Sequence, residues 1–166
     1  MIRHLLLSLP IALMIGLSAQ VAGQENKIPD QAREILENGA LFELLSIGYG
    51  ASQKNPPEDF HGWRVLGKTI IKDRDARKRL VAAMEKGVEE NSGKSMKCFD
   101  PRHGIRVAHN GITADFVICF QCFQALAYVA GGKEERFLIT DSPAPVFNQT
   151  LRDAKIPLAR TPGKKS

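Results

Sequence analysis

The chain has 166 residues, of which 43% are hydrophobic and 25% are charged, and its formal net charge is +5 at pH 7. This length is enough for one domain with one hydrophobic core. Lysine and arginine are scattered among aspartate and glutamate, except in the C-terminal RTPGKKS, so the charge pattern argues against a nucleic-acid partner.

The first residues have the pattern of a secretory signal peptide. A short basic start precedes an apolar run from Leu5 to Leu17, and the small residues at 21–23 suit cleavage by a signal peptidase. The run is too short to span a membrane and no further apolar segment follows it, so we expect no transmembrane segment after signal removal. The alternative is a retained anchor at the membrane surface. We therefore expect a periplasmic or extracellular protein with a signal at 1–23, one domain at 24–158 and a basic disordered tail at 159–166.

Hydrophobic periodicity then predicts a helix and two strands. Residues 29–38 have a short helical pattern that Gly39 ends, and residues 42–47 form a compact apolar run typical of a strand. The segment 51–62 contains Asn55-Pro56-Pro57 and is expected to be a loop. Residues 63–71 are rich in valine, isoleucine and threonine and predict the second strand.

The clearest pattern predicts a long amphipathic helix from Asp73 to Asn91. Asp73 can cap its first turn, and Asn91-Ser92-Gly93 ends it. Apolar residues recur at helical spacing along one side, namely Ala76, Leu80, Ala83, Met84 and Val88. We expect the charged opposite side to face solvent.

Asn110-Gly111 predicts a two-residue hairpin turn, because both residues accept positive φ. This turn pairs His109 with Ile112, Val107 with Ala114, Arg106 with Asp115 and Ile105 with Phe116. Since side chains alternate along a strand, one face carries Ile105, Val107, Phe116, Ile118 and Phe120 and is expected to meet the long helix. The other face carries Arg102, Arg106, Asp115 and Cys119.

The rest of the chain completes an α+β fold. The second strand of the hairpin is expected to continue toward Val129, Gly131-Gly132 turns the chain, and residues 136–139 form another strand. Ser142 is expected to cap a last helix. The order predicts a mostly antiparallel sheet of about five strands with a long central amphipathic helix and a C-terminal helix.

The three cysteines indicate a disulfide, because an exported chain meets an oxidising compartment. Ideal pairing places Phe99 opposite Cys122, and one residue bulged near Asp100-Pro101 brings Cys98 opposite Cys122. We therefore predict a bridge between Cys98 and Cys122, with Cys119 as the free thiol on the opposite face.

Two other fates of the cysteines remain open, namely buried free thiols and a metal site. Cys98, His103, Cys119 and Cys122 are ligand types that suit zinc as a cofactor. The ICFQCF context argues against it, because a straight strand points Cys119 and Cys122 to opposite faces. A thioredoxin-like Cys-x-x-Cys would open a helix, whereas this one is predicted in a strand.

No catalytic motif is recognisable in the chain. His103 falls on the face of Ile118, away from Cys119 and Asp115, so a packed or capping histidine is favoured over a catalytic one. His61 is expected at a surface or turn. The candidate binding patch is Arg102, Arg106 and Asp115, where arginines could hold an anion. The simpler interpretation is that Arg106 and Asp115 form only a surface ion pair.

The segments FHGWRVLGKTIIKD, CFDPRHGIR and DFVICFQC resemble those of an uncharacterised family of exported bacterial proteins. This resemblance implies an exported single domain and assigns no activity, ligand or site residue. We therefore expect a non-enzymatic role in binding or in the cell envelope, with an envelope or protein partner. The rival hypothesis is a metal- or thiol-dependent activity built on Cys98, His103, Cys119 and Cys122.

Overall fold

The computed structural model describes residues 26–49, 59–130 and 132–160. The predicted signal peptide and nearly all of the predicted tail lie outside these residues. The elements follow the order α1 (Asp30–Asn38), β1 (Leu41–Gly48), β2 (Asp59–Phe60), β3 (Trp63–Ile70), α2 (Arg74–Glu89), β4 (His103–His109), β5 (Ile112–Cys119), the 3₁₀ turn η1 (Phe120–Cys122), β6 (Gln124–Val129), β7 (Glu135–Leu138) and α3 (Ala144–Asp153). Within the described part of the chain, no helix is long and apolar enough to cross a membrane.

The strands form one antiparallel sheet in the order β2-β3-β1-β4-β5-β6-β7. The α+β prediction is confirmed, but the sheet has seven strands in a curled half-barrel, and the prediction of about five was wrong. One extra strand is β2, which lies in the segment that we expected to be a loop. The other arises because η1 divides the long strand predicted after the hairpin into β5 and β6.

The hairpin turn sets the register of the central strands as predicted. Asn110 and Gly111 both have positive φ, at 49° and 77°, which the tight turn between β4 and β5 requires. The observed pairs are His109 with Ile112, Val107 with Ala114, Arg106 with Asp115 and Ile105 with Phe116. The predicted assignment of side chains to the two faces of β4 and β5 follows from this register.

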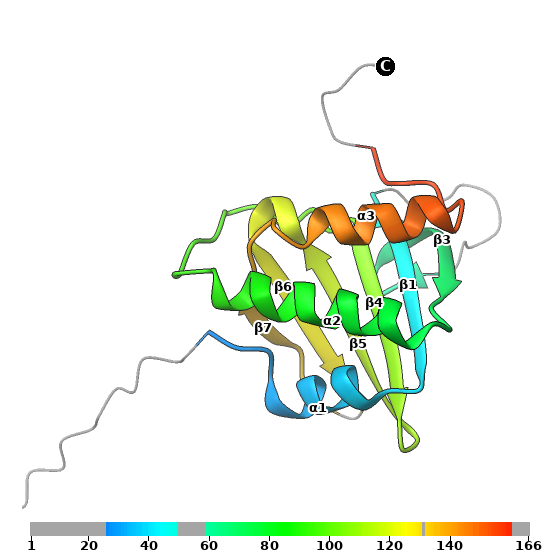
Figure 1. The fold of residues 1–166 in the computed structure, drawn as a ribbon. Coiled ribbons are helices and arrows are strands. Elements are labelled where there is room, and N and C mark those ends of the chain that lie inside the picture. The colour runs from blue at the N-terminus through cyan, green and yellow to red at the C-terminus, as the bar shows by residue number, and fades with distance from the viewer. Residues whose placement is uncertain (1–25, 50–58, 131, 161–166) are drawn as a thin grey trace, which may run out of the picture.

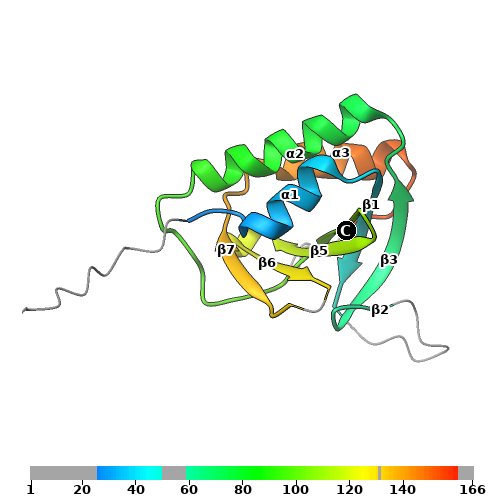
Figure 2. The ribbon, with the colours of Figure 1, turned by 90° about the horizontal axis from the view of Figure 1, so that it is seen from below.

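The helices cover one face of the sheet and form the main core with it (Figures 1 and 2). Asp73 caps α2, and its Oδ1 accepts a hydrogen bond from the backbone N–H of Ala76 at 2.6 Å. Leu80, Met84 and Val88 of α2 pack in the same cluster as the predicted inner face of β4 and β5.

The predicted cap at Ser142 was wrong: Pro143 precedes α3, and the Ser142 hydroxyl donates instead to Glu90 at 2.7 Å.

A second, smaller core covers part of the opposite face of the sheet. It contains Leu45, Ile47, Phe60, Val117 and Leu126. Phe60 reaches this face because the β2–β3 hairpin folds back over the curled sheet, and Gly104 leaves room for its ring. A Cβ atom at Gly104 would lie 2.8 Å from Cε1 of Phe60. The sheet therefore buries apolar side chains on both faces.

We expect Gly87→Ala to lower the free energy of unfolding by about 1–3 kcal/mol, because overpacking a tight contact is destabilising. A Cβ atom at Gly87 of α2 would lie 2.6 Å from Cγ of Pro143 and 3.0 Å from Cγ1 of Ile139. Helix propensity alone predicts a gain of about 1 kcal/mol for the same change. Urea unfolding measures the difference, and the opposite exchange Ala82→Gly, at an exposed position of α2, is the control and should lose about 1 kcal/mol. A more stable Gly87→Ala protein would contradict the close contact between α2 and the segment before α3.

Candidate functional site: a three-cysteine centre

The cysteine centre is built by the turn that ends β5. Residues 120–122 form the 3₁₀ turn η1, and Phe123 follows in the left-handed region with φ of 57°. In a 3₁₀ turn, residues three apart lie on the same side, so Cys119 and Cys122 face one another. The structure bonds them as a disulfide with a Cα–Cα distance of 5.3 Å. The backbone N–H of Cys122 also lies 3.2 Å from Sγ of Cys119.

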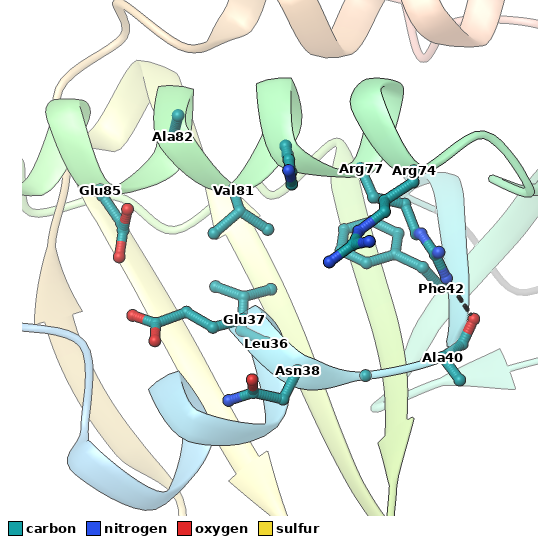
Figure 3. Close-up of a pocket in the computed structure, with 12 residues that line it drawn as sticks. Leu36, Glu37, Asn38, Ala40, Phe42, Arg74, Arg77, Val81, Ala82 and Glu85 are labelled. Carbon is teal, nitrogen blue, oxygen red and sulfur yellow. Dashed lines mark hydrogen bonds between the residues drawn. The ribbon is translucent and has the colours of Figure 1, made fainter.

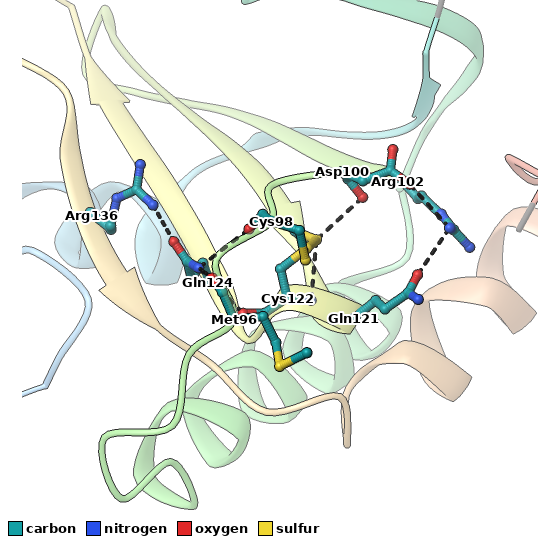
Figure 4. Close-up of a disulfide and its surroundings, with 9 residues drawn as sticks. Met96, Cys98, Asp100, Arg102, Gln121, Cys122, Gln124 and Arg136 are labelled. Carbon is teal, nitrogen blue, oxygen red and sulfur yellow. Dashed lines mark hydrogen bonds and ion pairs between the residues drawn. A yellow bond between two sulfur atoms is a disulfide. The ribbon is translucent and has the colours of Figure 1, made fainter. Parts of the chain in front are cut away.

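The third sulfur converges on the same place. Sγ of Cys98 lies 2.7 Å from Sγ of Cys122, and Sγ of Cys119 lies 3.2 Å from the carbonyl oxygen of Asp100. Figure 4 shows Cys98 on the segment before β4, crossing over the turn that carries Cys122. The sulfur of Cys122 therefore has two cysteine neighbours, the bonded Cys119 and the free Cys98.

Gln124 holds the Cys98 segment against the turn (Figure 4). Its buried side-chain amide donates to the carbonyl oxygen of Met96 and lies 3.4 Å from that of Cys98. The backbone N–H of Met96 in turn donates to the carbonyl oxygen of Cys122 at 3.0 Å. The guanidinium of Arg136 donates to the amide oxygen of Gln124 and orients the group. Gln124 is a positioning residue that sequence reasoning did not identify.

The three sulfurs differ in their access to solvent. Cys119 and Cys122 are 1% and 0% exposed, whereas Cys98 is exposed. The structure bonds Cys122 to Cys119 and leaves Cys98 as the free thiol. The physical reason is η1: a straight strand would separate Cys119 from Cys122, and the turn brings them together. The predicted bridge between Cys98 and Cys122 stays a prediction, and the two sulfurs lie 2.7 Å apart.

His103 stands apart from the sulfurs, so the four residues of the alternative zinc site do not come together. Its ring lies on the helix side of the sheet against Phe120 and Phe147, and Nε2 is 3.0 Å from Oδ1 of Asn148. Burial lowers the pKa of His103 to about 4. The packed histidine is confirmed. Among the residues that the structure describes, no group of three or more histidine, cysteine or acidic side chains is arranged to hold a metal ion.

Arg106 and Asp115 form a cross-strand pair that includes a third residue, His61. Asp115 accepts from Nε and Nη2 of Arg106 at 2.8 and 2.7 Å, and its Oδ2 lies 2.8 Å from Nε2 of His61. The His61 ring stacks on Tyr128 with centroids 3.8 Å apart. Burial raises the pKa of the Tyr128 hydroxyl, which donates to Glu134 at 2.7 Å. The Asp115 side chain is 9% exposed, so this cluster fastens the β2–β3 hairpin across the sheet rather than forming a simple surface ion pair.

The predicted patch is divided in the structure. Arg102 lies at the other end of β4, where it donates to Asp100 and Gln121 beside the cysteine turn. Arg106 and Asp115 instead line a shallow cavity with His61 and Tyr128. The signal that could have located His61 is the pair His61-Gly62, whose φ values of 53° and 82° make the tight turn of the β2–β3 hairpin. Its partners on β5 and β6 depend on the curl of the sheet, which no local pattern encodes.

Comparison of the chain with protein-family models, with curated proteins and with solved structures finds no match in any of the three.

The buried His103 predicts a loss of stability in acid. Its pKa is lowered from 6.5 to about 4 in the folded protein, so the unfolded chain binds a proton first as the pH falls. The neutral His103 ring therefore contributes about 3 kcal/mol to the free energy of unfolding above pH 6.5. This contribution is lost as the pH falls from 6.5 to about 4. Urea unfolding at several pH values should show that the free energy of unfolding falls less in acid for His103→Gln than for the wild type. For His109→Gln, at the hairpin turn, it should fall as much as for the wild type. Equal falls in the wild type and in His103→Gln would contradict the burial of a neutral ring.

Asp115→Asn should destabilise the protein by about 2 kcal/mol, because it weakens charge-assisted bonds to Arg106 and His61. The same substitution should cost less in a His61→Ala background, and the difference is the coupling of the two residues. Thermal or urea unfolding of the four proteins measures it. Glu135→Gln, an exposed exchange of similar chemistry, is the control. If the losses of stability caused by Asp115→Asn and His61→Ala simply add in the double variant, His61 does not fasten the hairpin through Asp115.

Proposed function

We propose that the chain is an exported thiol–disulfide exchange domain in which Cys98 connects a buried disulfide to solvent. The observation that carries the proposal is the position of Cys122, which is bonded to Cys119 while its sulfur lies 2.7 Å from that of Cys98. A partner thiol cannot reach a bond whose two cysteines are at most 1% exposed, but it can reach Cys98.

The exchange within the chain needs no external oxidant. The Cys98 thiolate attacks Sγ of Cys122, a Cys98–Cys122 bond forms, and the Cys122–Cys119 bond breaks. The electron pair leaves with the Cys119 sulfur, which takes up the proton that Cys98 released. The disulfide then includes an exposed sulfur.

The exposed disulfide can oxidise a dithiol partner. A partner thiolate attacks Sγ of Cys98, forms a mixed disulfide and releases Cys122 as a thiolate. The second thiol of the partner then attacks the partner's own sulfur in the mixed disulfide and releases Cys98. The partner gains a disulfide and the chain gains two thiols, and the reverse sequence reduces a partner disulfide.

The expected compartment agrees with this chemistry, because disulfides persist in the periplasm and outside the cell. Export itself rests on the pattern of residues 1–23 and on the resemblance to exported bacterial proteins. The non-enzymatic role favoured by the sequence would make Cys119–Cys122 only a structural cross-link. The approach of Cys98 to Cys122 favours the thiol-dependent hypothesis over that role.

The proposal predicts that Cys98→Ser slows reduction of the Cys119–Cys122 bond by dithiothreitol at least about tenfold, since the direct route to buried sulfur is blocked. Rapid acid quenching, alkylation and mass spectrometry measure the rate on the mature chain.

Ser92→Ala, an exposed exchange in the same connecting segment, is the matched control and should react like the wild type. Circular dichroism and urea unfolding should show a native Cys98→Ser protein, because the bonded pair is retained. A Cys98→Ser protein that is reduced at the wild-type rate would leave the disulfide with a structural role only.

A further inference from the structure

A second cavity lies on the helix side of the sheet, between the end of α1 and the stretch of α2 from Arg74 to Glu85. Its volume is about 560 Å³, which is within the usual range for small-molecule sites. Leu36 and Val81 supply apolar surface in its middle, and Phe42 lies beside Arg74 and Arg77 (Figure 3). Gly39 and Ala40, which follow α1, also line it. None of these residues belongs to the cysteine centre.

Charges of opposite sign occupy the two ends of this cavity (Figure 3). Arg74 lies at one end, and Lys78, one turn further along α2, also lines the cavity. Among the described residues neither cation has a hydrogen-bond or ion-pair partner. Arg77, beside them, donates to the carbonyl oxygen of Ala40 and is held in place.

The acidic end is formed by Glu37 and Glu85. One guanidinium, that of Arg33, serves both carboxylates, at 2.7 Å to Glu37 and 3.4 Å to Glu85. This end therefore keeps one excess negative charge. Burial and the neighbouring Glu37 raise the pKa of Glu85, so a cation placed here would relieve the repulsion between the two carboxylates.

We infer that this cavity binds a short peptide with free termini, with the C-terminal carboxylate at Arg74 and Lys78 and the N-terminal ammonium at Glu37 and Glu85. Arginine and lysine recognise carboxylates through charge-assisted hydrogen bonds, and the apolar surface accommodates a small apolar side chain between the two ends.

The spacing along α2 selects the length of the ligand. Lys78 and Glu85 are seven residues apart, which is about 10 Å along the helix axis, and Arg74 is about 16 Å from Glu85. An extended tripeptide spans at most about 10–11 Å. A tri- or tetrapeptide is therefore long enough to run from Glu85 to Lys78, the nearer of the two cations, whereas a single amino acid reaches only one charged group.

Isothermal titration calorimetry of the mature chain with Ala-Leu-Ala tests the inference. We expect binding, and we expect N-acetylation or C-terminal amidation of the peptide to weaken it about tenfold each, since each removes a charge-assisted contact. In the double variant Arg74→Gln, Lys78→Gln, the free acid and the amide should bind alike, while the N-acetyl peptide remains weaker. In the double variant Glu37→Gln, Glu85→Gln, the preference for the free amine should be lost and that for the free acid retained.

The control is the double variant Arg79→Gln, Glu89→Gln, which changes exposed charges of α2 outside the cavity and should bind as the wild type does. No detectable heat with millimolar Ala-Leu-Ala would overturn the inference. Equal affinity for the free and the N-acetylated peptide would also overturn it and would identify a plain anion site. The cysteine variants do not enter this experiment, so its outcome is independent of the proposed thiol chemistry.

Discussion

The tight turn at Phe120–Cys122 is the constraint on which the cysteine centre depends. It ends β5 at Cys119, and the left-handed backbone of Phe123 starts β6 in the opposite direction. The same three residues place Phe120 in the helix-covered core against His103 and bring Cys122 back to Cys119. Because the turn is short, Gln124 at the start of β6 can hold the Cys98 segment over it. A straight strand at these positions would separate the sulfurs.

Both faces of the sheet are covered, and the segment before β4 lies against two of the three sulfurs. The helices pack on one face, while the tip of the β2–β3 hairpin packs on the other, with Phe60 under Arg106 and His61 bonded to Asp115. Residues 96–102, in the segment that connects α2 to β4, lie beside the second core, where Phe99 contacts Trp63. Cys119 and Cys122 are buried against this segment, which contacts them through Asp100 and Met96, and Cys98 is exposed on it.

The sequence contained enough information for the local elements and for the register of the central hairpin. Asn110-Gly111 requires a tight turn, and that turn alone determined which residues of β4 and β5 face the helices. The apolar stripe and Asp73 located α2. The turn at Phe120–Cys122 could not be predicted in the same way, because ICFQCF contains no glycine or proline and has the composition of a strand. The contacts of His61 could not be predicted either, since they join β2 to β5 and β6 through the curl of the whole sheet. Because the turn at Phe120–Cys122 was not predicted, the approach of Cys119 to Cys122 was not foreseen, while the predicted neighbour of Cys122, Cys98, lies 2.7 Å away in the structure.

The most direct measurement is the distribution of the disulfide in the wild-type mature chain. Free thiols are labelled with one alkylating reagent and bonded cysteines, after reduction, with a second of different mass, and peptides are quantified by mass spectrometry. Exchange at Cys122 predicts free thiol divided between Cys98 and Cys119, with Cys122 bonded in every molecule and the larger share of free thiol at Cys98. Free thiol confined to Cys98, even after incubation at alkaline pH where thiolates form, would contradict exchange at the three-cysteine centre.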